Sequence, residues 1–177
     1  MNKRIKVAVA GVGSCASALI QGVEYYSRNP NETVGLMYPD IGGYRLSDIE
    51  FVIGFDIDAR KVGRSLREAI YSPPNCNMRV IPEDEFISVI SPEATVFKGP
   101  VLDGIAPHMR NLDQSITFVE DLSQPELTTE EFQQLLETHQ IDILLNYMPV
   151  GAEEASAWYI ENAIAAGVHI INCMPTY

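Results

Sequence analysis

The hydrophobic and polar positions along the chain change period repeatedly, which predicts alternating strands and helices. Residues 5–10 (IKVAVA) are small or β-branched, as is typical of a strand buried on both faces of a parallel sheet. Helical spacing follows at once, with Ala16, Leu19, Ile20 and Val23 on one face. The pattern predicts strands at 5–10, 51–55, 95–98, 141–147 and 168–173, and helices at 14–26, 59–70, from Thr128 onward and at 152–166.

Helix start and stop signals support this order. Thr128 and Glu131 have the spacing of a capping box, and Phe132 and Leu136 give the helix after them a buried face. Gly167 ends the last helix. Strands that alternate with helices indicate an α/β protein with a doubly wound parallel sheet, a Rossmann-like fold.

Two segments break the alternation. Residues 27–50 are rich in proline and glycine and are long for a connection between a helix and a strand. Residues 72–94 contain four prolines and are predicted to be irregular, with a short strand at 78–81. The glycine-rich loop 99–104 then follows a strand, at the sheet edge where ligands bind in such folds.

The junction between the first strand and helix matches the dinucleotide fingerprint G-x-G-x-x-A. Gly11 permits a tight turn, Gly13 lets the backbone approach a pyrophosphate, and Ala16 allows close packing of helix on strand. The helix N-terminus offers free N–H groups and a partial positive charge to the phosphates. Small residues also follow strands for packing alone, so a purely structural turn remains the alternative.

Asp56 ends the second strand, where an acidic residue accepts hydrogen bonds from the adenosine ribose. Its charge would repel the extra phosphate of NADP, which favours NAD, although Arg60 and Lys61 would weaken that repulsion. Asp56 lies 43 residues beyond Gly13, about twice the usual ~20 of the fingerprint.

Composition and charge exclude several classes of protein. At 177 residues and a mean hydropathy of +0.01, the chain has the length and composition of one globular unit, and residues 1–177 are expected to form a single domain. Residues 1–80 carry a net charge of +2 and residues 81–177 a net charge of −14, which disfavours nucleic acid and anionic membranes as partners. No apolar run is long enough to span a membrane, and three cysteines without metal-ligand spacing suit reduced thiols in a cytoplasm.

Other chemistry-bearing residues form no recognisable constellation. The three histidines are scattered, and Cys15 at the helix N-terminus is interpreted as a small side chain beside the cofactor. Glu153 and Glu154 are interpreted as a favourable first turn of a helix. The sequence therefore predicts neither a catalytic residue nor a metal site.

Longer blocks of the sequence carry more information than the glycine turn alone. They are VAVAGVGSCASALIQGVEYY, GLM, FVIGFDIDARKVG, GPVLDGI, LLNYMPVGAEEA and AGVHIINCMP. In this order the blocks resemble one enzyme family, the prokaryotic myo-inositol-1-phosphate (inositol-3-phosphate) synthases, and the resemblance covers nearly all of the chain.

The resemblance implies an NAD-dependent isomerase of inositol and phospholipid biosynthesis. In the family, bound NAD oxidises D-glucose 6-phosphate, an aldol closure forms the ring, and the NADH formed reduces the ketone, so NAD is a retained catalyst. It implies that Gly11, Gly13, Ser14, Cys15 and Ala16 cradle the pyrophosphate, that Asp56 holds the adenosine ribose, and that Asp103, Gly104, Tyr147, Pro149, Gly151 and Asn172 line the cofactor crevice.

Members of that family are roughly twice as long, and their later part holds the sugar phosphate and the catalytic lysines. The present chain has no lysine beyond Lys98, so it resembles an N-terminal portion whose sheet lacks its returning segment. We expect glucose 6-phosphate to bind and react only with the missing half, and the full-length form to be a homo-oligomer. A stand-alone NAD-binding module without chemistry, or the cofactor half of another NAD(P) oxidoreductase, remain alternatives.

Overall fold

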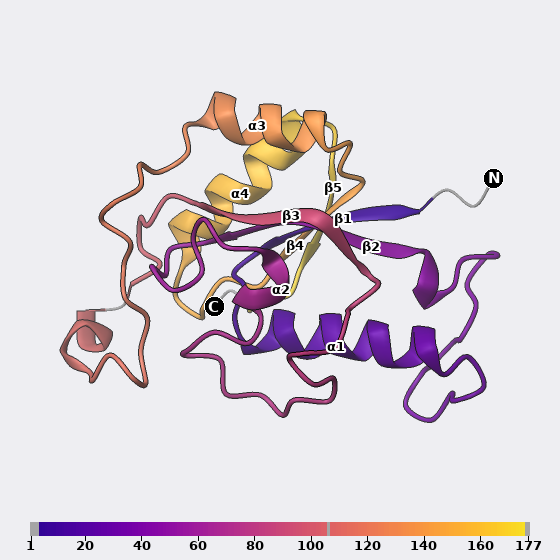
Figure 1. Cartoon of the computed structure of the whole chain (residues 1–177). Helices are drawn as coiled ribbons and strands as arrows, with labels where there is room; N and C mark the ends of the chain where they lie inside the picture. The colour runs from indigo at the N-terminus through magenta and orange to yellow at the C-terminus, as the bar shows by residue number, and fades with distance from the viewer. Residues whose placement is uncertain (1–3, 106, 176–177) are drawn as a thin grey trace.

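A five-stranded sheet, all of it parallel, organises the computed structural model, which describes residues 4–105 and 107–175 (Figure 1). The strand order is β3-β2-β1-β4-β5, so the chain reverses its direction of winding between β1 and β4. This confirms the predicted α/β doubly wound fold. The strands are β1 (Ile5–Ala10), β2 (Ile49–Asp56), β3 (Ile90–Lys98), β4 (Ile143–Asn146) and β5 (His169–Asn172).

Helices cover both faces of the sheet. One face carries α1 (Ser14–Arg28) and the short α2 (Leu66–Ala69), whereas α3 (Thr129–Thr138) and α4 (Glu153–Ala165) lie on the other (Figure 1). Thr128 and Glu131 form the predicted capping box at the start of α3. None of the helices in the described ranges is long and apolar enough to cross a membrane.

The side chains of β1 alternate between two cores. Val7 and Val9 pack with α1, whereas Ala8 and Ala10 pack with the residues of α3 and α4. All four are buried, as the continuous apolar run predicted for a strand covered on both faces. The central strand thereby carries the glycine turn on a rigid support.

Two element predictions were wrong. A helix was expected at 59–70, but only the short α2 forms there. Gly63 has a positive φ of 75°, which interrupts a helix. The carboxylate of the buried Asp58 accepts hydrogen bonds from the amides of Arg60 and Val119, which hold the preceding residues in a turn. The short strand expected at 78–81 does not form, because these residues bond to the side chains of α1 instead of to a neighbouring strand.

A polar stripe along α1, made of Ser14, Ser17, Gln21 and Glu24, holds this irregular segment in place. Gln21 and Glu24 are buried and accept hydrogen bonds from backbone amides that no strand satisfies. The stripe therefore fixes a loop that reaches the glycine turn at its other end. The contacts in order along α1 are Ser14 with Cys76, Ser17 with Asn77, Gln21 with Val80 and Ile81, and Glu24 with Ser88 and Val89.

Candidate functional site

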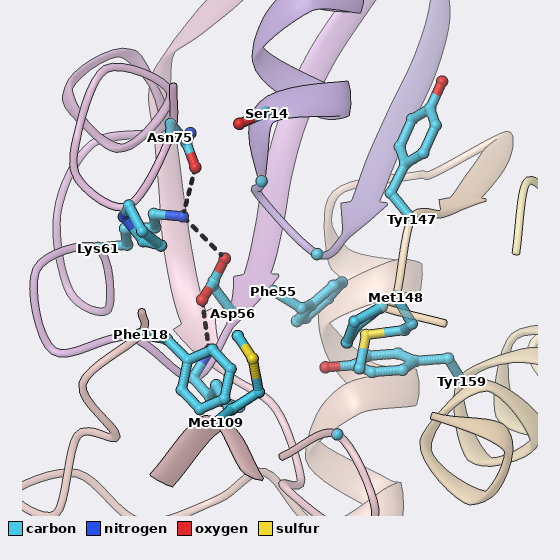
Figure 2. Close-up of a pocket in the computed structure, with 16 residues that line it drawn as sticks. Ser14, Phe55, Asp56, Lys61, Asn75, Met109, Phe118, Tyr147, Met148 and Tyr159 are labelled. Atoms are coloured by element: carbon cyan, nitrogen blue, oxygen red, sulfur yellow. Dashed lines mark hydrogen bonds and ion pairs between the residues drawn. The ribbon is translucent and has the colours of Figure 1, made fainter. Parts of the chain in front are cut away.

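A cavity of about 260 Å³ lies at the carboxyl ends of β1, β2 and β4, where the strand order reverses (Figure 2). Ligands of open α/β sheets bind at this topological position. Its walls are mainly apolar, with Asp56, Lys61 and Asn75 as polar groups on one side. The lining residues are Gly11, Gly13, Ser14, Phe55, Asp56, Ile57, Lys61, Pro74, Asn75, Gly104, Met109, Phe118, Tyr147, Met148, Pro149 and Tyr159.

The two glycines of the turn differ in why they are glycine. Gly11 has a φ of +87°, and a Cβ there would lie 2.6 Å from the Tyr147 carbonyl oxygen, so the fold itself requires glycine. Gly13 has a φ of −86°, and a Cβ there would meet no atom within 4 Å. Neither backbone strain nor packing against neighbouring protein atoms therefore requires glycine at position 13.

The start of α1 is open to an anion. Gly13 is the N-cap residue, and within the described part of the chain no side chain caps this helix and no acidic residue occupies its first turn. The first N–H groups of a helix and its dipole then provide a partial positive charge at the cavity wall. This arrangement is a general phosphate-binding site.

Asp56 braces the glycine turn as well as facing the cavity. Its Oδ2 accepts a hydrogen bond from the Val12 amide at 3.0 Å, and its Oδ1 accepts from the amides of Ile57 and Asp58. Lys61 Nζ lies 3.6 Å from Oδ2. A carboxylate has about four acceptor positions, so Oδ2 keeps room for one more donor, as a ribose hydroxyl would supply.

Lys61 and Asn75 hold the carbonyl group of the same residue, Val12. The buried Lys61 ammonium donates to the Val12 carbonyl at 2.8 Å, and Asn75 Nδ2 donates to the same oxygen at 3.2 Å. Lys61 also donates to Asn75 Oδ1 at 2.9 Å (Figure 2). Val12 is thus fixed at both its N–H and its C=O. Arg60, by contrast, pairs with Asp58 and the carbonyls of Gln114 and Thr117.

Asp103, predicted to line the crevice, caps α4 instead of bordering the cavity. Its carboxylate accepts from the amides of Glu154 at 2.8 Å and Ala155 at 2.9 Å, while α4 has no cap from its own N-cap residue Ala152. Partial burial alone would raise the pKa of Asp103, but these backbone hydrogen bonds outweigh it and lower the pKa below its ordinary value. The neighbouring Gly104 does line the cavity.

Replacing Asp103 by alanine should lower the free energy of unfolding by about 1–2 kcal/mol, the usual cost of a lost helix cap. Urea unfolding followed by circular dichroism measures this. Asp113→Ala is a matched control, because Asp113 accepts from Ser115 in an exposed turn and touches no helix end. Equal losses in the two variants would contradict the capping role.

The remaining predicted residues divide into two groups. Tyr147 and Pro149 border the cavity, but the Tyr147 hydroxyl points away from it (Figure 2). Burial, with a smaller effect of Cys173, raises the pKa of Tyr147 to about 12. The others do not line the cavity, and their cofactor roles stay predictions: Cys15 and Gly151 are exposed, Ala16 is buried in the core, and Asn172 bonds to Asn146 at 2.9 Å.

Sequence reasoning missed part of the cavity wall. Met109, Phe118, Met148 and Tyr159 come from separate segments, and their apolar character is that of ordinary core residues. The sequence indicates only the charge of Lys61, because nothing in it shows that this side chain is buried against Val12. A buried lysine close to the end of β2 is visible only once the turn 59–63 is folded.

Comparisons with known proteins name relatives of one kind. The chain is 41% identical to the inositol-3-phosphate synthase of Corynebacterium glutamicum and 37% identical to that of Mycolicibacterium smegmatis, in each case over 98% of this chain and 44% of the relative. The crystal structure of Ari2 matches with a TM-score of 0.74 and 27% identity, over 98% of this chain and 46% of that one. No protein-family model matches the chain.

The chain thus spans less than half the length of the curated relatives that it matches. The match runs through nearly the whole chain, including the glycine turn, β2 with Asp56 and the loop before α4. By sequence, the chain is a relative of the inositol-3-phosphate synthases and corresponds to a portion of them, as the resemblance of its sequence blocks predicted.

Proposed function

We propose that the chain binds NAD in this cavity and forms the cofactor-binding part of an inositol-3-phosphate synthase. Gly13 carries the proposal, because its open Cβ position leaves ligand approach as the reason for glycine. The uncapped start of α1 lies beside it and suits a pyrophosphate. The curated relatives are named for the same activity.

Different residues of the cavity would bind different parts of the dinucleotide. The turn 11–14 and the start of α1 would hold the pyrophosphate, and Asp56 Oδ2 would accept a hydroxyl of the adenosine ribose. Lys61 and Asn75 act indirectly, by fixing the Val12 peptide between the two glycines. They preorganise the glycine turn, which lowers the entropy cost of binding the ligand.

The same geometry supports NAD over NADP. The extra phosphate of NADP would approach the Asp56 carboxylate, whose negative charge repels it. Lys61 Nζ lies 3.6 Å from Asp56 Oδ2 and offsets part of that charge, whereas Arg60 is paired with Asp58. The remaining repulsion disfavours NADP.

The reaction itself needs more than this chain. NAD, when bound, supplies a hydride acceptor that is regenerated within the cycle. The proposed substrate is glucose 6-phosphate, and the lysines that the family uses for proton transfer would lie in the part of the relatives that this chain does not cover. We therefore expect no turnover from the chain alone.

Titration calorimetry tests the proposal. The chain should bind NAD at least 10-fold more tightly than NADP, and Asp56→Ala should narrow that ratio. Asp56 also accepts a hydrogen bond from the Val12 amide, so its removal should weaken the binding of both cofactors. The ratio of the NAD and NADP affinities therefore reports the charge of Asp56, and an unfolding curve of the variant reports the loss of the Val12 contact. Equal binding of the two cofactors by the wild-type chain would contradict the assignment of Asp56.

A further inference from the structure

The cavity contains a buried phenol whose hydroxyl has no hydrogen-bond partner among the described residues. Tyr159 on α4 is 1% exposed, and its hydroxyl points into the cavity (Figure 2). Among the described residues, none forms a hydrogen bond with this oxygen, and none of their fully enclosed side-chain oxygens lacks a partner. The Tyr159 hydroxyl therefore faces the open volume of the cavity.

The ring is fixed so that the hydroxyl has one position. Its centroid lies 5.8 Å from that of Phe55, 5.5 Å from that of Phe132 and 5.1 Å from that of Trp158. Gly99 at the end of β3 makes the necessary room, because a Cβ there would lie 1.6 Å from Tyr159 Oη. A donor held this rigidly loses little entropy when it binds a ligand.

The hydroxyl lies on the side of the cavity that receives the adenosine half of a dinucleotide. In doubly wound sheets the adenosine lies over the strands on the β2 side of the switch point, and Gly99 follows β3 on that side. Burial, and then the negative charges of Asp56 and Glu126, raise the pKa of the Tyr159 phenol above its ordinary value. The group therefore stays protonated and can donate at neutral pH.

We infer that Tyr159 is a ligand-binding residue, whose hydroxyl donates a hydrogen bond to the adenosine half of the bound dinucleotide opposite Asp56. This inference rests on the proposed binding of NAD and adds a contact from α4, which packs on the face of the sheet opposite α1 (Figure 1). It also assigns a role to Gly99, which keeps the space that the phenol occupies.

The test compares the 177-residue chain with its Tyr159→Phe variant, titrated with NAD and with ADP-ribose, which lacks nicotinamide. We expect affinity to fall roughly 3- to 10-fold for both ligands, the value of one neutral hydrogen bond. The melting temperature of the free variant should stay the same or rise, because the lost hydroxyl has no hydrogen-bond partner in the described part of the chain. Weaker ligand binding together with unchanged stability would show that the Tyr159 hydroxyl contacts the ligand and does not stabilise the fold.

Tyr71→Phe is the matched control. Tyr71 is also buried, but its hydroxyl donates to the Ile81 carbonyl at 2.9 Å, so its loss should lower the melting temperature and leave NAD affinity unchanged. Unchanged affinity of Tyr159→Phe would overturn the inference while leaving NAD binding intact. A loss with NAD but not with ADP-ribose would overturn the adenosine placement, and a wild-type chain that binds neither ligand would overturn the proposed function and this inference with it.

Discussion

Gly13→Val should abolish most NAD binding, by 100-fold or more, while leaving the unfolding midpoint of the free chain close to that of wild type. The Cβ of residue 13 would point into space where no atom of a neighbouring segment lies within 4 Å. The substitution should therefore cause no steric clash in the ligand-free protein and change its stability little. A pyrophosphate seated on the turn would meet the valine methyl groups directly. Calorimetry with NAD and thermal unfolding without it measure the two halves of this result.

Substitutions at two other glycines, Gly22 and Gly11, serve as controls for Gly13→Val. Gly22 lies in α1 with open space around its Cβ position, so Gly22→Ala should keep NAD affinity and slightly stabilise the helix. Gly11→Ala should damage both properties, because of its positive φ and the Tyr147 carbonyl. If Gly13→Val binds NAD as wild type does, the glycine turn has only a structural role and the proposed function loses its main support.

Glu24→Ala should cost about 3 kcal/mol of unfolding free energy, the largest loss of stability that we expect from a single polar residue here. Its carboxylate is 1% exposed, accepts from the amides of Ser88 and Val89, and bonds to Arg28 Nε at 2.6 Å. Removal of the carboxylate leaves the part-buried Ser88 amide and the buried Val89 amide without this acceptor. Glu83→Ala is the control, since Glu83 pairs with Arg79 on the surface and should change stability little.

The same carboxylate predicts a pH dependence. Burial alone would raise the pKa of Glu24, but hydrogen bonds from Arg28, Ser88 and Val89 lower it below its ordinary value of 4.5. A pKa that is lower in the folded state stabilises the fold above pH 4.5, and this contribution is lost as the pH falls below that value through the folded pKa. Urea unfolding from pH 7 to pH 3 should therefore show a smaller acid loss for Glu24→Gln than for wild type, and parallel curves would contradict this prediction.

The local pattern of the sequence determined the frame of this protein. The apolar run 5–10, the glycines after it and the helical spacing from residue 16 predicted β1, its turn and α1, because each depends on neighbours within a few residues. The alternation of strands and helices likewise predicted the parallel sheet, and the capping box of Thr128 and Glu131 predicted the start of α3. Asp56 was found because the end of β2 is a fixed place in such folds.

Only the tertiary structure decided how these parts meet. Lys61 reaches Val12 across 49 residues of sequence, and Asp103 caps α4 across 51, so no local pattern could report either contact. Gln21 and Glu24 have the pattern of ordinary polar positions on a helix. In the structure, Gln21 accepts hydrogen bonds from the segment predicted as a strand at 78–81, and Glu24 accepts them from residues 88 and 89. Tyr159 looks like a core aromatic in the sequence, and only the packing of α4 beneath Gly99 turns its hydroxyl into the cavity. The physical reason is common to all of these: burial and partner choice are set by distances between segments that fold together, and sequence spacing does not encode those distances.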